Sequence, residues 1–197
     1  MNLNFSDEQN LLRDSVSRFC TSDYDFETRM KSVNSDSGFS KEHWKLFADL
    51  GWLAVPFDEE LGGLGGDVLD LSILFEEFGK SIVVEPYLAN VVLAGGVLKR
   101  SGFDKKDEYL SSIVSGEKQF SLANYEPEKG YNLENIETVL DDKGLLSGSK
   151  STVLNAPNAD YFIVFSKKGD DFCFSLVSKD ADCLLYTSDA ADEEAWG

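Results

Sequence analysis

The strongest constraint on the fold is a change in hydrophobic pattern near Gly116. Before this residue, apolar side chains recur at the three-to-four-residue spacing of amphipathic helices, whereas after it short apolar runs alternate with turn sequences. Helices followed by strands indicate an α+β chain in which the two kinds of structure are segregated. We therefore expect an all-helical domain over residues 1–116 and a domain of antiparallel strands over residues 117–182.

Capping residues mark the expected helices of the first part. Ser6, followed three residues later by Gln9, matches a capping box. Ser40 and Asp67 are expected N-caps of a second and a third helix, and Gly79 is expected to end the third.

Three further segments complete the predicted helical part. The polar, turn-rich stretch 22–37 is expected to be a connection. Pro86 suits the first turn of a fourth helix, because its missing N–H would have no helical partner there. A shorter helix is expected from Tyr109 to Gly116.

Two turn sequences organise the expected strands. Residues 141–144 and 168–171 each contain Gly with Asp and Lys, which is typical of hairpin turns. The strands expected around them are 120–125, 138–140, 145–153, 161–165 and 172–177.

The charge balance excludes some classes of partner. The chain has 36 Asp and Glu against 18 Lys and Arg, a net charge of −18, which disfavours binding to nucleic acids and to anionic membranes. The longest charge-free apolar stretch, 86–98, is shorter than the roughly 20 residues of a membrane helix, and the N-terminus lacks the pattern of a secretory signal. With three cysteines and no metal-ligand spacing, a cytoplasmic protein is expected.

Three features that resemble catalytic or binding motifs have simpler interpretations. The glycine-rich loop 62–66 has neither the P-loop nor the dinucleotide spacing, so a turn between helices is expected. His43, the only histidine, is expected to face solvent. Glu76 and Glu77 are adjacent and should point to different faces of their helix, so paired-carboxylate catalysis is not indicated there.

The last residues have an unusual sequence. Residues 183–193 match the translation of a sequencing adapter, so 183–197 are predicted to be a non-native tail. The alternative is a genuine acidic terminal segment. Without the four acidic residues of the tail the net charge is −14, so the chain is acidic under either interpretation.

Several strings resemble the acyl-CoA dehydrogenase family over about residues 1–182. The main ones are LGWLAVP at 50–56, ELGGLG at 60–65 and FEEFG at 75–79. The strings DFETR at 25–29 and EPYLA at 85–89 resemble the small subunit of pimeloyl-CoA dehydrogenase.

This resemblance implies a fold and an activity. The family has a helical N-terminal domain, a middle antiparallel β-barrel and a C-terminal four-helix bundle, and only the first two would fit in this chain. It implies FAD-dependent α,β-dehydrogenation of an acyl-CoA, with electrons passing to an electron-transfer flavoprotein, in a homo- or hetero-oligomer. The catalytic base of most members lies in the C-terminal bundle, so the resemblance implies no catalytic residue here.

The resemblance places the first FAD contact at residues 125–132, which read YEPEKGYN where the family typically has TEP followed by GSD. Tyr125 stands in place of a threonine that would bond the flavin edge, and Tyr131 in place of a serine near the pyrophosphate. Leu122 and Asn124 would occupy the neighbouring strand positions.

The second FAD contact is expected at residues 148–155. Thr152 stands where the family usually packs an aromatic ring on the flavin, and Leu154 replaces a polar contact. Fewer hydrogen bonds, each worth about 1 kcal/mol, and no stacked ring would weaken flavin binding. Three hypotheses follow: a flavin-containing dehydrogenase, a non-catalytic partner subunit with a degenerate flavin site, and a protein that binds acyl-CoA without redox chemistry.

Overall fold

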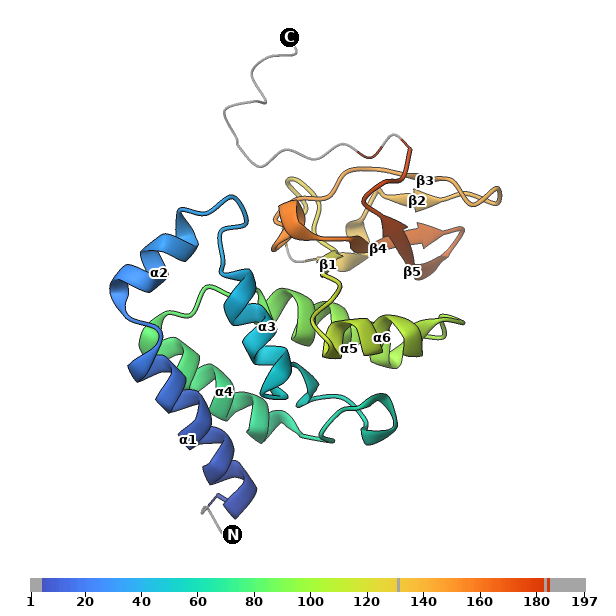
Figure 1. Ribbon diagram of the computed structural model, residues 1–197. Helices are drawn as coiled ribbons and strands as arrows, with labels where there is room; N and C mark the ends of the chain where they lie inside the picture. Colours follow the sequence, from blue (N-terminus) through green and yellow to red (C-terminus); the bar gives the residue numbers. More distant parts are fainter. Residues whose placement is uncertain (1–4, 131, 183, 185–197) are drawn as a thin grey trace. The chain divides into compact units, whose positions relative to one another are not determined.

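The computed structural model describes residues 5–130, 132–182 and 184 of the chain (Figure 1). Contacts divide the chain into a helical unit, the described residues of Met1–Tyr87 and Leu98–Glu117, and a sheet unit, those of Leu88–Val97 and Lys118–Gly197. The α+β class is therefore confirmed. The predicted tail, residues 183–197, lies outside the described residues except for Leu184.

The helical unit is built from short and medium helices (Figure 1). They are α1 (Asp7–Ser22), α2 (Phe26–Val33), α3 (Lys41–Asp49), η1 (Trp52–Ala54), η2 (Glu59–Leu61), α4 (Val68–Ser81) and α6 (Lys106–Val114). A further helix, α5 (Gly95–Arg100), begins in the sheet unit and ends in the helical unit. No helix in the described part has the length and apolarity needed to cross a membrane.

The predicted N-caps are confirmed. The hydroxyl of Ser6 accepts a hydrogen bond from the N–H of Gln9 at 3.2 Å, and the Gln9 side chain accepts from the N–H of Ser6 at 3.0 Å. Ser40 caps α3, and Asp67 caps α4. Each interaction satisfies a backbone donor that has no partner within the helix.

Two predictions in this unit are wrong. The stretch 22–37 is not only a connection, because it contains α2, which begins where Asp25 accepts from the N–H of Thr28 at 2.8 Å. Gly79 does not end its helix: α4 continues to Ser81 and stops at Ile82, which adopts a left-handed conformation with φ +52°.

Aromatic side chains form much of the core of the helical unit. Phe47 of α3 is fully buried, and its ring centroid lies 4.9 Å from that of Trp52 and 5.3 Å from that of Phe78. Phe19 of α1 packs edge-on against Phe47, at 5.2 Å. The apolar spacing that predicted these helices therefore corresponds to one buried surface.

The glycine-rich loop 62–66 connects η2 to α4, as predicted. Its N–H groups bond the backbone of the segment before it: Gly65 donates to the carbonyl of Phe57 at 2.8 Å and Gly66 to that of Val55 at 2.7 Å. A Cβ on Gly63 would lie 2.1 Å from the Phe57 carbonyl oxygen. Glycine is needed because the two backbones are in direct contact, and these two N–H groups are not available to a phosphate.

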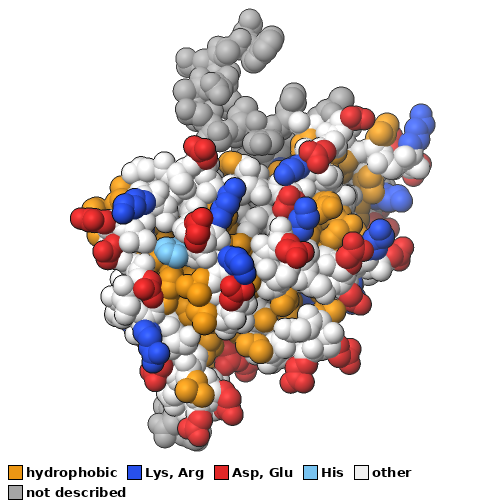
Figure 2. Space-filling view, viewed as in Figure 1, with side chains coloured by type: hydrophobic (Ala, Val, Ile, Leu, Met, Phe, Trp, Pro, Cys, Tyr) orange, Lys and Arg blue, Asp and Glu red, His pale blue; other side chains and the backbone are white. Residues whose placement is uncertain are grey.

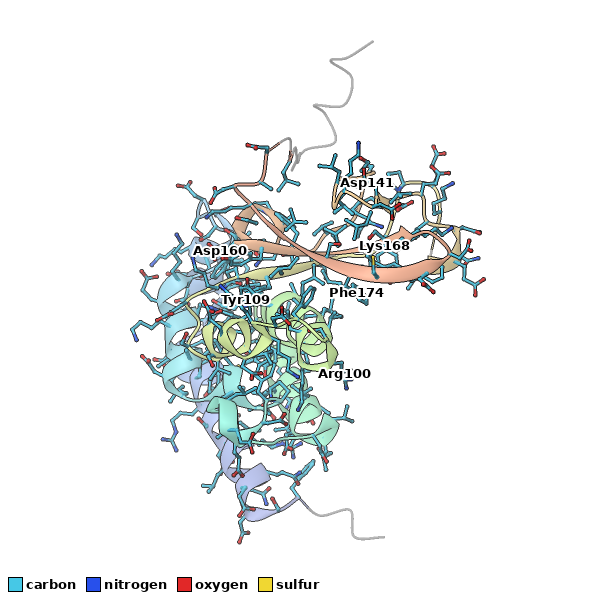
Figure 3. The ribbon with its side chains drawn as sticks, turned by 90° about the vertical axis from the view of Figure 1, so that its right-hand side faces the viewer. Arg100, Tyr109, Asp141, Asp160, Lys168 and Phe174 are labelled. Carbon is cyan, nitrogen blue, oxygen red and sulfur yellow. The ribbon has the colours of Figure 1, made fainter. Side chains whose placement is uncertain are left out.

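The sheet unit contains a five-stranded mixed sheet. Its strands are β1 (Phe120–Ala123), β2 (Val139–Leu140), β3 (Leu146–Ser147), β4 (Tyr161–Lys168) and β5 (Asp171–Ser178). The long strand β4 pairs with β5 along its whole length and also with β1 and β2. Figure 3 shows Lys168 and Phe174 on the β4–β5 hairpin.

The expectation of purely antiparallel strands is wrong. Strand β1 runs parallel to β4, with Phe120 opposite Tyr161, and β2 is also parallel to β4. The two hairpins, β2–β3 and β4–β5, are antiparallel as predicted. Hairpin turns determine only local pairing, whereas β1 meets β4 after a long connection that can return the chain in either direction.

The strand predicted over 145–153 is also largely wrong. Only Leu146 and Ser147 pair with β2, after which the chain leaves the sheet. Thr152 and Asn155 adopt left-handed conformations, with φ +53° and +60°, which a continuing strand cannot contain.

A helical segment with the wider π-type winding, η3 (Leu88–Ala94), belongs to the sheet unit. Pro86 was expected to open this helix, but the helix begins after it. Asn90 is fully buried there and accepts from the N–H of Phe120 at 2.9 Å, while its amide donates to the carbonyl of Lys118 at 3.2 Å. Asn90 therefore holds η3 against the start of β1.

Candidate functional site

The structure brings together the two segments expected to contact a flavin. The N–H of Ser151, in the segment 148–155, donates to the carbonyl of Tyr125, in the segment 125–132, at 2.9 Å. Next to this bond, the ammonium of Lys150 lies 2.8 Å from the carboxylate of Glu126. The two segments are thus joined by a backbone bond and by an ion pair between adjacent residues.

The predicted contact residues occupy different environments. Leu122 lies half-buried in β1 opposite Ile163, and Asn124 and Tyr125, just beyond the strand, are also half-buried. Thr152 and Leu154, in the segment 148–155, are exposed. Tyr131 lies outside the described residues.

Glu126 is the centre of the polar contacts in this region. Its side chain is 4% exposed, and its carboxylate accepts hydrogen bonds from the N–H of Glu137 at 2.6 Å and from the N–H and hydroxyl of Thr138 at 2.9 and 2.5 Å. Together with Lys150, these donors connect three stretches of chain: 125–132, 137–139 and 148–155. A buried carboxylate with several donors, including a cation, is well compensated.

The pKa of Glu126 reflects this environment. Burial raises it, but the hydrogen bonds from Lys150, Thr138 and the backbone lower it more, so that the pKa is about 2 instead of 4.5. The carboxylate is therefore ionised at any physiological pH.

Gly148 allows the second segment to approach the same contacts. A Cβ at this position would lie 2.5 Å from the hydroxyl oxygen of Thr138, which bonds Glu126. The backbone at Gly148 therefore packs directly against the residue that helps to hold the carboxylate.

Sequence reasoning identified the two segments but missed what joins them. The resemblance contains Glu126 only within the string YEPEKGYN and Gly148 and Lys150 only within the range 148–155, and Thr138 is predicted only as the start of a strand. The available signals were the Glu126-Pro127 dipeptide and a lysine, Lys150, in an otherwise small and polar stretch. Neither signal indicates that Glu126 and Lys150 form an ion pair.

The residues present fit a flavin in their backbone arrangement more than in their side chains. Exposed Thr152 and Leu154 leave this edge accessible to a flat ligand, and Asn124, Tyr125 and Thr152 carry polar groups that could bond its rim. Among the described residues of the set, Tyr125 has the only aromatic ring. These residues could contact a flavin, with fewer polar groups than the family pattern implies.

His43, in the helical unit, does not face solvent as expected. Its side chain is 17% exposed, and Nδ1 lies 3.2 Å from the carboxylate of Glu85, which also accepts from the hydroxyl of Tyr24 at 2.8 Å. Burial raises the pKa of Tyr24, which keeps this hydroxyl protonated as a donor. The cluster ties the segment after α4 to α3 and to the end of α1, and this accounts for the histidine without a catalytic role.

The glutamate pair behaves as predicted. The Glu76 side chain is 53% exposed and that of Glu77 is 4% exposed, so they lie on different faces of α4. Arg13 and Lys80 contact both carboxylates.

No group of three or more metal-ligating side chains lies close enough to hold a metal ion within the described ranges. On the face shown in Figure 2, acidic and basic side chains are interspersed.

Comparison with protein families identifies the helical part. Residues 6–117 match the acyl-CoA dehydrogenase N-terminal domain. The chain belongs to the acyl-CoA dehydrogenase family. The resemblance to pimeloyl-CoA dehydrogenase in particular stays a prediction.

Curated relatives cover the sheet unit as well. The chain is 30% identical over 169 residues to the caffeyl-CoA reductase-Etf complex subunit CarC of Acetobacterium woodii, covering 83% of this chain and 44% of that protein. It is 31% identical over 191 residues to L-prolyl-[peptidyl-carrier protein] dehydrogenase of a Serratia species, covering 90% and 48%. The chain thus spans less than half the length of these two relatives.

Solved structures show the same fold. The FAD complex of PigA superposes with a TM-score of 0.79 at 27% identity, over 91% of this chain and 50% of that one. The ChsE4-ChsE5 complex from Mycobacterium tuberculosis superposes with a TM-score of 0.79 at 26% identity, over 90% and 49%. The helical region followed by a sheet is therefore the first half of the acyl-CoA dehydrogenase fold.

Proposed function

We propose that the complete gene product is an FAD-dependent acyl-CoA dehydrogenase, of which this chain supplies the helical region and the flavin-facing part of the sheet. One observation carries the proposal: the segments 125–132 and 148–155, where the resemblance implies FAD contacts, are joined by the Ser151–Tyr125 backbone bond. FAD would supply the hydride acceptor for oxidation of the acyl β-carbon.

The residues of this chain would bind and orient that cofactor. Asn124 and the hydroxyl of Tyr125 would contact its polar rim, and Leu122 would form an apolar floor next to Ile163. Thr152 would offer a hydroxyl where other members offer a ring. The base that removes the acyl α-proton is proposed to lie outside this chain, because the buried carboxylate of the site, Glu126, is paired with Lys150.

A second function is favoured by a specific observation. Thr152 and Leu154, at two of the expected contacts, are exposed and offer neither a ring nor, at Leu154, a polar group. A non-catalytic partner subunit of a heteromeric dehydrogenase would show this weakening of its own flavin site. The ChsE4-ChsE5 complex, on which this chain superposes, is an assembly of two differently named chains. Under this hypothesis the catalytic partner would hold the flavin and meet the electron-transfer flavoprotein.

Bound flavin distinguishes the two. The complete gene product is purified without added FAD and then titrated with FAD, and the visible absorption of the protein fraction is recorded. A dehydrogenase purifies yellow, or becomes yellow on titration and retains the flavin through gel filtration. A preparation that stays colourless at saturating FAD, with a folded circular-dichroism spectrum, refutes the first proposal and supports the second.

Amplification of the gene across codon 182 tests the remaining assumption. If the reading frame continues past Asp182 through a further helical domain with an inward-facing carboxylate, the enzyme proposal gains a base that can be tested by mutation. If the gene ends at Gly197, the partner-subunit function becomes the better one.

A further inference from the structure

We propose that Glu126 and Lys150 are positioning residues that hold the two flavin-facing segments, 125–132 and 148–155, in register. The inference rests on the proposed function for its consequence, which is flavin affinity, but the positioning itself is a property of this chain alone.

The first argument is burial. The side chains of Glu126 and Lys150 are 4% and 8% exposed, and their charged atoms are 2.8 Å apart. Desolvating two charges is expensive, and such a pair is a poor source of stability in comparison with apolar packing. The residues around it are arranged to satisfy the carboxylate fully, with both N–H groups of Glu137 and Thr138 pointing at it. This arrangement fixes the position of the carboxylate relative to the three stretches of chain that contact it.

The second argument is position in the chain. Glu126 follows Tyr125 directly, and Lys150 precedes Ser151 directly, so the ion pair lies beside the Ser151–Tyr125 backbone bond. Two adjacent links between the same two segments prevent one from sliding or rotating against the other. A single hydrogen bond would leave that freedom.

The third argument is the conformation of the next residue. Thr152 has φ +53°, a left-handed conformation that is unfavourable for a non-glycine residue. It persists only where the surrounding structure holds it, and the fixed neighbours are Lys150 and Ser151. The Glu126–Lys150 ion pair therefore determines where the Thr152 side chain lies.

The test uses three variants of the complete gene product and a matched control. Lys150→Met and Glu126→Gln each remove one charge, and Lys150→Arg retains it. The control, Lys45→Met, removes the ion pair of Lys45 with Asp49 in α3, whose side chains are 75% and 58% exposed. Exposed pairs contribute little, so this control should change neither measurement.

Two quantities are measured below the unfolding temperature of each variant: the Kd for FAD and the hydrogen-exchange rate of the Ser151 amide. We expect Lys150→Met and Glu126→Gln to raise the Kd about tenfold or more, because each strands a buried partner. Lys150→Arg should restore most of the affinity. The Ser151 amide should exchange faster in the first two variants, while amides of α1 exchange unchanged.

The outcomes separate the inference from the proposed function. If the wild type binds FAD and the two charge-removing variants bind it as tightly as Lys45→Met does, the positioning role is refuted and the enzyme proposal stands. If the wild type binds no FAD, the proposed function fails, and the Ser151 exchange rate alone decides: faster exchange supports positioning, and unchanged exchange overturns it. Where Lys150→Met unfolds the sheet unit, the double variant Glu126→Gln/Lys150→Met, which leaves no unpaired charge, gives the same comparison.

Discussion

Replacing Gly63 by alanine should lower the unfolding free energy of the helical unit more than alanine at any other glycine of the glycine-rich loop. The added Cβ would lie 2.1 Å from the carbonyl oxygen of Phe57 and 2.8 Å from that of Asp58, both backbone atoms that cannot rotate away. The loop must therefore move. The bonds that hold it, from Leu64, Gly65 and Gly66 to the backbone before the loop, are 3.0, 2.8 and 2.7 Å long. With about 1 kcal/mol for each, we expect a loss of about 3 kcal/mol.

Two other glycines serve as controls for this prediction. Gly65 has φ +64° and open space around its Cβ position, so Gly65→Ala should cost only the left-handed conformation, about 1–2 kcal/mol. Gly79 lies within α4 with open space and ordinary helical geometry, so Gly79→Ala should stabilise the unit by about 1 kcal/mol. The expected order of stability is Gly79→Ala, wild type, Gly65→Ala, Gly63→Ala.

Urea unfolding followed by tryptophan fluorescence measures these differences. Trp52 is 1% exposed in η1, immediately before the segment that the loop contacts, so its emission reports the helical unit. The free energies of unfolding come from linear extrapolation at constant slope. A Gly63→Ala variant as stable as Gly65→Ala would show that the loop can relax without losing its backbone bonds, and the reasoning from close approach would be wrong.

Three other changes have expected outcomes. The pKa of folded Glu126 is about 2 instead of 4.5, so the ionised carboxylate stabilises the fold fully above pH 4.5, and this stabilisation is lost as the pH falls toward 2. The stabilisation amounts to about 3 kcal/mol. In urea unfolding of the sheet unit at decreasing pH, the free energy of unfolding should therefore fall less steeply in Glu126→Gln than in the wild type. Ser40→Ala removes the N-cap of α3 and should lower the unfolding free energy by about 1 kcal/mol, measured by the same fluorescence assay. Phe47→Ala opens a cavity in the aromatic core and should cost about 3–5 kcal/mol, and a loss below 1 kcal/mol would contradict the buried packing.

The helices with caps could be predicted from the sequence because a cap is a local interaction. Ser6 and Gln9 bond each other's backbone within one turn, so the letters alone carry the geometry. Helix α2 was missed because it buries little: Phe26 is 66% exposed and Ser32 is its only buried residue. Without an apolar stripe, the only signal was Asp25 at the cap, and a single cap residue does not distinguish a helix from a turn.

The parallel pairing of β1 with β4 could not be predicted for a different reason. Strand order and direction across a long connection depend on tertiary packing, which period-two alternation does not encode. The Asn90 side chain, which holds η3 to the start of β1, is likewise a contact between segments that are distant in the sequence. His43 was misjudged because its charged neighbour, Glu85, is 42 residues away.

The candidate site divides into residues that build its frame and residues that would touch a ligand. The frame consists of the Glu126–Lys150 ion pair and the close approach at Gly148, whereas Tyr125 and Thr152 are positions where the sequence departs from the family pattern. The frame has a cost, because it desolvates an ion pair and keeps Thr152 in a left-handed conformation. A sheet that served only as a scaffold would be at least as stable with an apolar pair and a relaxed loop. We therefore propose that this strained, buried arrangement is present because the segment orients a ligand, which supports the flavin-binding proposal over the partner-subunit one.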